Sequence, residues 1–494
     1  MKIPGQWEPS PQVEVKAGWN RLLVKCVSSK RAWHLTACVS PAPPVEYETR
    51  NIVWMTPMPG PSWCSPIVVG DRIFVGADEG TLVCVNKADG RILWMKSTTY
   101  YHAASDEDRA KFTDLEPKVK QLDSMVDQLV SDINAALASG KAAENPARKK
   151  IEEKVKLEGA IRDAMAKADR KFLAWYNDAG WATPTPTSDG ERVYAAFFGG
   201  NKGLGANVVA CFTLDGRRVW SHFCGQTGIG EHGTHCSPAL CGDYLVYKTG
   251  EKLFGFDKKT GKIAWTEKVG GSIGASTVPV RIGDLIAALV PQSGIHRASD
   301  GRLLWKADFR SGSSTLFVVG DLFGGVAEDY FHVHRLPAAA ADSVKPETIC
   351  RKSWDDLGLK LPGTYTNTII ASPLYADGLV YVVSEGGGLV VVDASTGKIA
   401  YTQALEALNP RLTWVFKVGI CSSPCLGGKY VFIRDDQAQT LVIEPGTKYK
   451  EVAKNMLVEL DDAGSQIESQ SNFFFDGDRI YFRSSQYLYC IGPR

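Results

Sequence analysis

A five-residue pattern that recurs at five places constrains this chain more than any other feature of its sequence. In each copy a glycine is followed by a lysine or arginine, two further residues and an aromatic residue, and the spacing does not vary. The copies are "GRILW", "GRRVW", "GKIAW", "GRLLW" and "GKIAY", which end at Trp94, Trp220, Trp265, Trp305 and Tyr401. Five copies in one register indicate an internal repeat, which has to be recognised before other features are interpreted.

A second recurring signal gives the repeat its length. Eight glycine-containing turn sequences each precede an apolar strand, at Gly70, Gly190, Gly242, Gly283, Gly320, Gly378, Gly428 and Gly477. A Ser-Pro or Thr-Pro pair stands ahead of most of them, at Ser65, Thr183, Ser237, Ser372 and Ser423. One unit therefore consists of four short strands separated by turns over roughly 40–45 residues, which is typical of a β-propeller blade.

The two ends of the repeat predict how the ring closes. The last unit, "FFFDGDRIYFRSSQYLYCIGPR", supplies only three strands, whereas "NIVWMTPMPG" near the N-terminus contains a single strand with Trp54. We therefore predict an all-β, eight-bladed β-propeller over residues 46–494, with four-stranded antiparallel blades and the N-terminal strand closing the last blade. Such closure removes an exposed sheet edge. The unit between Gly320 and Trp354 fits the pattern least well.

The aromatic residues of the repeat are expected to lie between neighbouring blades. Burial of each ring would contribute roughly 2–3 kcal/mol. The predicted docking residues are Trp54, Trp94, Trp220, Trp265, Trp305 and Tyr401.

Residues 103–176 interrupt the repeat and predict a helical coiled-coil hairpin inserted between blades 1 and 2. One apolar stripe steps by four and three through Leu115, Val119, Leu122, Val126, Leu129 and Ile133. The second helix would bury Ile151, Val155, Met165, Phe172 and Trp175. Pro117 is expected to kink or divide the first helix. Either the two stripes cover each other, or the hairpin is a partner-binding arm or a lid over one propeller face.

Residues 1–45 are predicted to form a separate β-hairpin segment, which is interpreted as the remnant of a jelly-roll domain. Apolar and polar residues alternate on both sides of "SSKRA". The first ten residues lack the apolar region of a signal peptide, and no stretch reaches the roughly 18–20 apolar residues of a membrane span. A net charge of +1 gives no indication of nucleic-acid binding. The twelve cysteines lack the spacing of a disulfide framework and are interpreted as small buried apolar residues.

The repeats resemble the tryptophan-docking repeats of the pyrroloquinoline-quinone-like (PQQ-like) β-propeller superfamily. That superfamily contains quinoprotein dehydrogenases and the lipoprotein scaffold of the bacterial outer-membrane β-barrel assembly machinery. "KAGWNRLLVK", "NIVWMTPMPG", the inserted hairpin and "YLYCIG" are similar to a planctomycete-type subgroup of unassigned function. The resemblance implies an extracytoplasmic location, periplasmic or secreted, with a cytoplasmic one as the alternative.

The enzymes of this superfamily have sequence motifs that can be looked for in this chain. Quinoprotein alcohol dehydrogenases carry adjacent cysteines over the quinone, a calcium or lanthanide site and often a Cys-x-x-Cys-His haem motif. This chain has no Cys-Cys pair and no haem motif, and "CSSPC" at Cys421 has the wrong spacing. No catalytic residue, metal site or cofactor is therefore predicted, although PQQ with Ca²⁺ remains the cofactor of the alternative hypothesis.

The start of each innermost strand would lie near the mouth of the propeller channel, which is a common place for a ligand site. Tryptophan, histidine and thiol side chains gather at these positions and could form a small-molecule or sugar pocket; the alternative is that they plug the channel. The candidates are Trp63, Cys64, Trp181, His235, Cys236, Ser276 and Cys421. His332 and His334 share one strand face and are interpreted as a surface pair.

The intact repeat without dehydrogenase motifs predicts a binding or scaffold propeller that engages a protein or small ligand through the channel mouth or the helical arm. Two alternatives remain open: a PQQ-dependent oxidoreductase of alcohols or sugars with a divergent site, and a carbohydrate-binding propeller. The sequence does not decide the oligomeric state.

Overall fold

The computed structural model describes most of residues 51–493. The described residues exclude 1–50, 143–144, 173–182, 202–203, 229–235, 271–273, 310–312, 328–329, 341, 360–370, 407, 409–418, 437–438, 458–468 and 494. The N-terminal hairpin expected over residues 1–45 therefore lies outside them.

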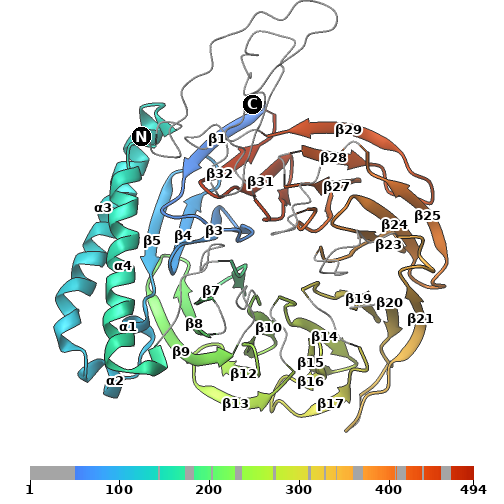
Figure 1. The fold of residues 1–494 in the computed structure, drawn as a ribbon, viewed down its shortest axis with the longest axis horizontal. Coiled ribbons are helices and arrows are strands. Elements are labelled where there is room, and N and C mark those ends of the chain that lie inside the picture. The colour runs from blue at the N-terminus through green and yellow to red at the C-terminus, as the bar shows by residue number, and fades with distance from the viewer. Residues whose placement is uncertain are drawn as a thin grey trace, which may run out of the picture.

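The described residues form eight four-stranded antiparallel sheets arranged in a ring (Figure 1), which confirms the predicted eight-bladed β-propeller. In blades 1 to 7 the four strands follow one another in sequence order from the centre outward. Blades 1 to 4 consist of β2 (Ile67–Val69), β3 (Arg72–Ala77), β4 (Thr81–Asn86) and β5 (Ile92–Ser97); β6 (Thr187–Ser188), β7 (Arg192–Asn201), β8 (Leu204–Thr213) and β9 (Arg218–Gly228); β10 (Ala239–Cys241), β11 (Tyr244–Lys248), β12 (Lys252–Asp257) and β13 (Ile263–Lys268); and β14 (Val278–Ile282), β15 (Leu285–Val290), β16 (Gly294–Arg297) and β17 (Leu303–Lys306).

The second half of the ring repeats this arrangement. Blades 5 to 7 consist of β18 (Phe317–Val319), β19 (Leu322–Val326), β20 (Tyr330–Arg335) and β21 (Glu347–Ser353); β22 (Leu374–Ala376), β23 (Leu379–Val383), β24 (Gly388–Asp393) and β25 (Ile399–Ala404); and β26 (Cys425–Gly427), β27 (Tyr430–Arg434), β28 (Gln439–Ile443) and β29 (Glu451–Met456). The unit that fits the sequence pattern least well is thus a complete blade, blade 5.

Blade 8 is assembled from both ends of the described chain, as predicted. Its inner strands are β30 (Phe474–Asp476), β31 (Arg479–Arg483) and β32 (Tyr487–Ile491), and β1 (Ile52–Pro57) pairs antiparallel with β32 as the outermost strand. Trp54 lies opposite Cys490 in this pairing. Ring closure therefore depends on non-covalent pairing between segments more than 400 residues apart in the sequence.

The repeat motif joins blade 8 to blade 1, and blades 1, 2 and 3 each to the blade that follows. The indole N–H groups of Trp54, Trp94, Trp220 and Trp265 donate to backbone carbonyls of the following blade, at Lys87, Leu214, Lys258 and Ala298, over 2.9–3.2 Å. The motif glycine of the following blade lies directly under the ring: a Cβ atom on Gly90 would come within 2.7 Å of Trp54, and one on Gly216 within 2.7 Å of Trp94. Each of these glycines also has a positive φ, so both space and backbone conformation require glycine there.

The strand residue opposite each indole is small. Cys490, Cys84 and Cys211 face Trp54, Trp94 and Trp220 across their strand pairs, and Gly255 faces Trp265. All three cysteines are buried. These thiols thus act as small apolar residues that leave room for the neighbouring ring.

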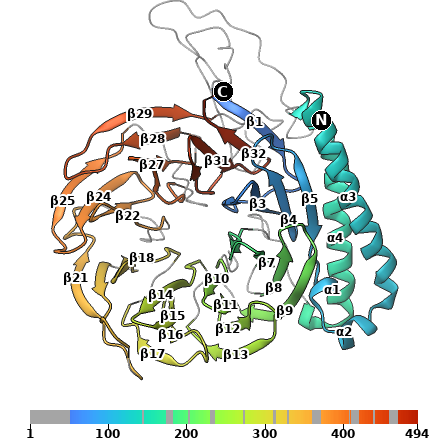
Figure 2. The ribbon, with the colours of Figure 1, turned by 180° about the vertical axis from the view of Figure 1, so that it is seen from behind.

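The insertion between blades 1 and 2 contains α1 (Tyr100–Ala103), α2 (Asp106–Ala110), the 3₁₀ turn η1 (Thr113–Leu115), α3 (Glu116–Ala138), α4 (Arg148–Ala168) and the 3₁₀ turn η3 (Arg170–Phe172). Figures 1 and 2 show α3 and α4 lying antiparallel along the outer edge of the ring, beside β5. The predicted apolar stripe of α3 is buried, but it packs on blade 1 as well as on α4. Of the two outcomes expected at Pro117, the structure shows division: α2 ends at Ala110 and α3 begins at Glu116, so Pro117 stands in the first turn of α3, where its missing N–H has no partner to lose.

Candidate functional site

The innermost strands all begin on the same face of the ring, which we call the mouth face. At the start of seven of these strands a polar side chain accepts a hydrogen bond from the corresponding backbone N–H of a neighbouring blade, and in blade 2 Thr185 contributes its backbone N–H. Seven such bonds of 2.8–3.0 Å run from Thr185 to Ser237, Ser237 to Ser276, Ser276 to Thr315, Thr315 to Ser372, Ser372 to Ser423, Ser423 to Asn472 and Asn472 to Ser65. We call these eight residues the hydroxyl ring, although Asn472 contributes an amide oxygen.

The hydroxyl ring explains the Ser-Pro and Thr-Pro signals of the sequence. Ser65, Ser237, Ser372 and Ser423 are ring members, and the proline that follows each of them begins the innermost strand region. In blade 2 the ring member is Thr185, ahead of Pro186, so the pair chosen from the sequence, Thr183-Pro184, lies two residues too early. The signal therefore marks contacts between blades.

The repeat register sorts the candidate site residues into three positions. Ser276 belongs to the hydroxyl ring, and its Oγ atom accepts from the Ser237 N–H. Cys64 and Cys236 stand one residue before the ring and are completely buried. Trp63 and Cys421 stand two residues before the ring and are partly exposed. Trp181 and His235 lie outside the described residues.

The two buried thiols are poor nucleophiles. Burial raises the pKa of Cys64 to about 12, and its Sγ atom accepts from the Gly76 N–H at 3.2 Å. Burial also raises the pKa of Cys236, whose thiol donates to the Ala275 carbonyl at 3.2 Å. Because the thiolate is the reactive form of cysteine, both groups are protonated and inert near neutral pH.

The donor set for a quinone and its metal ion does not come together in the described part of the chain. Three or more His, Cys, Asp or Glu side chains placed to hold a metal are absent from it. The ten cysteines that it contains are all free thiols.

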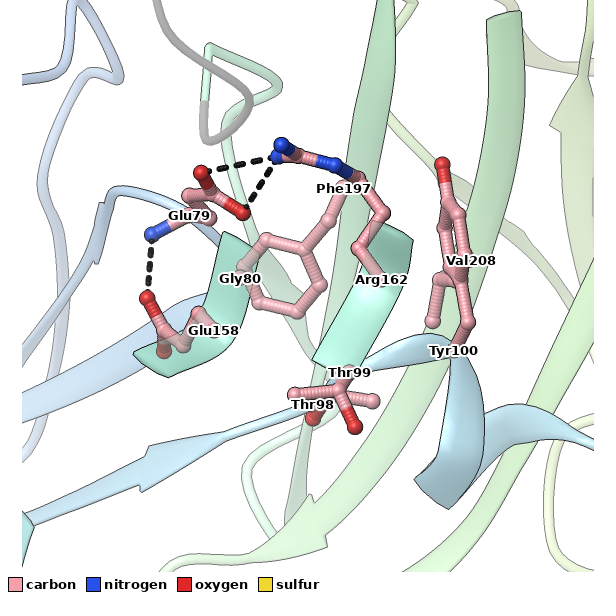
Figure 3. A pocket seen from close by; sticks show the side chains of 9 residues that line it. All are labelled: Glu79, Gly80, Thr98, Thr99, Tyr100, Glu158, Arg162, Phe197 and Val208. Atoms are coloured by element: carbon pink, nitrogen blue, oxygen red, sulfur yellow. Dashed lines mark hydrogen bonds and ion pairs between the residues drawn. The ribbon is translucent and has the colours of Figure 1, made fainter. Parts of the chain in front are cut away.

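A second site, not predicted from the sequence, lies where α4 meets the turn between β3 and β4. A cleft there is lined by Glu79, Gly80, Thr98, Thr99, Tyr100, Glu158, Arg162, Phe197 and Val208 (Figure 3). The space not filled by protein atoms, open solvent included, is about 350 Å³. The Phe197 ring stands in the middle of this lining, and the Glu79 and Arg162 side chains face each other beside it.

Glu79, Lys154 and Glu158 are buried around this cleft, and Arg162 is partly buried beside them. Arg162 donates to both carboxylate oxygens of Glu79 at 2.9 Å. Glu158 accepts from the backbone N–H of Glu79 at 3.0 Å and pairs with Lys154 at 3.1 Å, where both side chains are at most 2% exposed. Such a network is stable only if every charge keeps its partner. It therefore fixes the position of α4 on blade 1.

Glu79 is the member of this network whose charge is most sensitive to pH. Burial raises the pKa of Glu79 to about 7; Arg162 opposes the rise, and the nearby carboxylates of Glu158 and Asp78 add to it. The carboxyl group therefore changes its charge close to neutral pH.

The sequence carried a signal for this network that hydrophobic patterning overlooks. Lys154, Glu158 and Arg162 are spaced by four residues, so they share one face of α4. Charged residues at this spacing usually form a solvent-exposed face. Here the stripe is buried because the β3–β4 turn offers backbone and carboxylate partners.

The interpretation of His332 and His334 as a surface pair is wrong. Both are buried between blades 4 and 5, at 1% and 5% exposure, and the His332 ring stacks near Phe309 with 4.0 Å between ring centroids. Neither ring nitrogen of His332 has a hydrogen-bond partner among the described residues. Burial lowers the pKa of His332 well below its ordinary value, so the ring is neutral and acts as an aromatic filler.

Comparison with known proteins identifies the family. The sequence profile described as "Outer membrane protein assembly factor BamB" matches residues 44–110, 163–336 and 359–492, which together make up more than half of the chain. The chain belongs to this PQQ-like repeat family. The gaps in the match coincide with much of the helical insertion and with part of blade 5.

Solved structures show the same fold at low sequence identity. BamB from Moraxella catarrhalis is 10% identical, with a TM-score of 0.50, over 89% of this chain and 99% of that one. The computationally designed protein Ika8 is 9% identical, with a TM-score of 0.47, over 88% of this chain and all of that one. A search of curated protein sequences found no match. Within the described residues, no helix combines the length and apolar character needed to span a membrane.

Proposed function

We propose that this protein is a non-catalytic scaffold that binds a protein partner on its mouth face, outside the cytoplasm. The observation that carries the proposal is the use of polar groups on this face: the hydroxyls of the hydroxyl ring and the Cys236 thiol join neighbouring blades, and the Cys64 thiol is bonded within blade 1. Membership of the BamB-like family supports a scaffold role and an extracytoplasmic location.

Trp63 is the best-placed binding residue on this face. It is partly exposed, and it stands between Ser62 and Cys64, which are at most 1% exposed and hold the local backbone. The Ser62 Oγ atom accepts from the Cys64 N–H at 2.9 Å. A large amphipathic ring on a fixed backbone is the kind of residue that dominates protein interfaces.

Photo-crosslinking in the native cell tests this proposal. A photoreactive amino acid at position 63 should capture one discrete protein, whereas the same group at position 319 should not. Val319 is a suitable control because it lies at the opposite end of an innermost strand and is 43% exposed. Purified Trp63→Ala should then bind the captured protein at least about tenfold more weakly. Equal capture at both positions, or unchanged affinity, would contradict the proposal.

The two alternative functions predict different results with the same purified protein. Saturable thermal stabilisation by PQQ with Ca²⁺, together with dye-linked oxidation of an alcohol or sugar, would replace the scaffold by an oxidoreductase. Binding to a glycan array that is lost in Trp63→Ala would identify the partner as a carbohydrate. We expect neither result.

A further inference from the structure

Residues 58–61, which we call the seam, connect β1, the strand that completes blade 8, with the chain that enters blade 1. The pairing of β1 with β32 closes the ring and is non-covalent. The ring can therefore open next to the seam by separating only the outermost strand of blade 8.

Each of the four seam residues is held by a different group. Met58 donates its N–H to the Gln486 carbonyl at 2.8 Å, and the Pro61 carbonyl accepts from the Asp78 N–H at 3.1 Å. The Gly60 carbonyl accepts from the Arg483 guanidinium at 2.6 Å. The Pro59 carbonyl accepts from the Lys154 ammonium at 3.4 Å. Blade 8, blade 1 and the inserted helices therefore meet at the seam.

Of these four contacts, only the one made by Lys154 comes from the insertion. Its ammonium group is completely buried, donates to the carbonyls of Pro59 and Asp78, and pairs with Glu158. A lysine is very rarely buried unless its charge is fully compensated. Glu158 lies on α4 itself, so the carbonyls of Pro59 and Asp78 are the part of that compensation that is present only when α4 is docked.

Lys154 lies on α4, and both α4 and its neighbour α3 are anchored to blade 1. Glu158 accepts from the hydroxyls of Ser97 and Thr81 at 2.6 and 3.3 Å. On α3, the Asn134 side chain makes two hydrogen bonds to the backbone of Ile92 in β5. Lys154 thus reaches the seam from a rigid base.

We propose that the α3–α4 pair is a strap that locks the ring closure of the propeller, and that Lys154 is the residue through which the strap holds the seam. This assigns the insertion a conformational role in place of a free arm. The seam continues directly into Trp63, so the strap also fixes the backbone that presents this residue on the mouth face.

Hydrogen exchange on Lys154→Met and the matched control Lys156→Met tests the strap. Met keeps the length and apolar stem of lysine without its charge, and Lys156 is an exposed residue of the same helix. In Lys154→Met, the amides of Asp78, β1 and β32 should exchange roughly tenfold faster or more, because their local opening no longer breaks a buried ionic contact. The amides of blade 4, across the ring, should keep their rates, and Lys156→Met should match the wild type.

Two outcomes would overturn the strap: unchanged protection at the seam, or an equal acceleration in all blades. If Lys154→Met does not fold, Glu158→Gln provides the test, because it removes the counter-charge and leaves the ammonium group in place. Faster exchange confined to the same amides is again expected, and wild-type rates there would refute the role of Lys154. The measurement needs no binding partner, so it stands apart from the proposed scaffold function.

Discussion

The outer strand of blade 1 and those of blades 3, 4 and 6 carry the same repeat motif but meet different surroundings. In β5 the residue that follows the lysine or arginine of the motif is Ile92. Its equivalents in blades 3, 4 and 6 are Ile263, Leu303 and Ile399. Ile92 is 2% exposed, whereas the other three are 42%, 44% and 37% exposed. The α3–α4 insertion covers this position in blade 1, whereas the equivalent side chains of the other three blades remain in contact with water.

At the covered edge of blade 1, a side chain of the insertion pairs with the backbone of Ile92. The Asn134 amide oxygen accepts from the Ile92 N–H at 2.8 Å, and its amide nitrogen donates to the Ile92 carbonyl at 2.9 Å. An amide side chain thus pairs with the strand edge in the way that a further strand would. Apolar residues on the bare edges are isolated, and isolated exposed apolar residues are normal on protein surfaces.

Truncation at this position gives the largest expected difference between the edges. Ile92→Ala should lower the free energy of unfolding by about 3 kcal/mol, since it removes buried methyl groups and leaves a cavity under α3. Ile263→Ala should cost less than about 0.5 kcal/mol, because its side chain is already largely in water. Urea denaturation of both variants measures the difference. Equal losses would show that α3 does not rest on blade 1 in solution.

The covered side of blade 1 should also respond to pH. Glu79 has a pKa of about 7 in the folded protein, above its value in the unfolded chain, so the folded state binds the extra proton. Stability that is fully present below about pH 4.5 is therefore lost as the pH rises through about 7, by about 3 kcal/mol in total. Glu79→Gln cannot titrate and should lack this slope.

Denaturation of wild type and Glu79→Gln between pH 5 and 8 checks the effect. The difference between the two free energies of unfolding should change steadily up to about pH 7 and then level off. Glu152→Gln, an exposed change on α4, serves as the control and should follow the wild type. A difference curve that is flat over this range would place the Glu79 pKa near its ordinary value.

Loss of the Asn134 amide should have a smaller effect than loss of Ile92. Asn134→Ala leaves the N–H and carbonyl of Ile92 under α3 without these partners, which should cost about 2 kcal/mol. Ser131→Ala, on an exposed position of the same helix, should cost almost nothing. If both variants unfold at the same urea concentration, water replaces the amide at this edge and α3 is held by apolar contacts alone.

Much of the fold could be predicted because the repeat encodes it locally. The Gly-to-aromatic spacing places an indole on one blade and the glycine under it on the next, so Trp54 and Gly90 can be recognised from sequence although they belong to different blades. Ring closure followed from counting strands at the two ends. The break at Pro117 could be anticipated because proline fits the first turn of a helix and not its interior, and α3 begins at Glu116 after α2 has ended at Ala110.

The sites could not be predicted in the same way, because they depend on partners far away in the sequence. Lys154 has the sequence environment of a surface lysine, and only the carbonyls of Pro59 and Asp78 explain its burial. Ser276 resembles a ligand-binding serine until the N–H group of Ser237, in the preceding blade, is placed next to it. Polar side chains take their role from the group that they meet.

The hydroxyl ring offers the smallest effect and one that should not depend on the insertion at all. Ser65 in covered blade 1 accepts from the Asn472 N–H at 2.9 Å, and Ser372 in bare blade 6 accepts from the Thr315 N–H at 2.9 Å. Ser65→Ala and Ser372→Ala should each cost about 1 kcal/mol, because each leaves one backbone N–H without its acceptor. Urea denaturation beside an exposed control, Ser124→Ala, measures both. A large loss in blade 1 alone would mean that the hydroxyl contact depends on the strap, and the repeat would then no longer be equivalent around the ring.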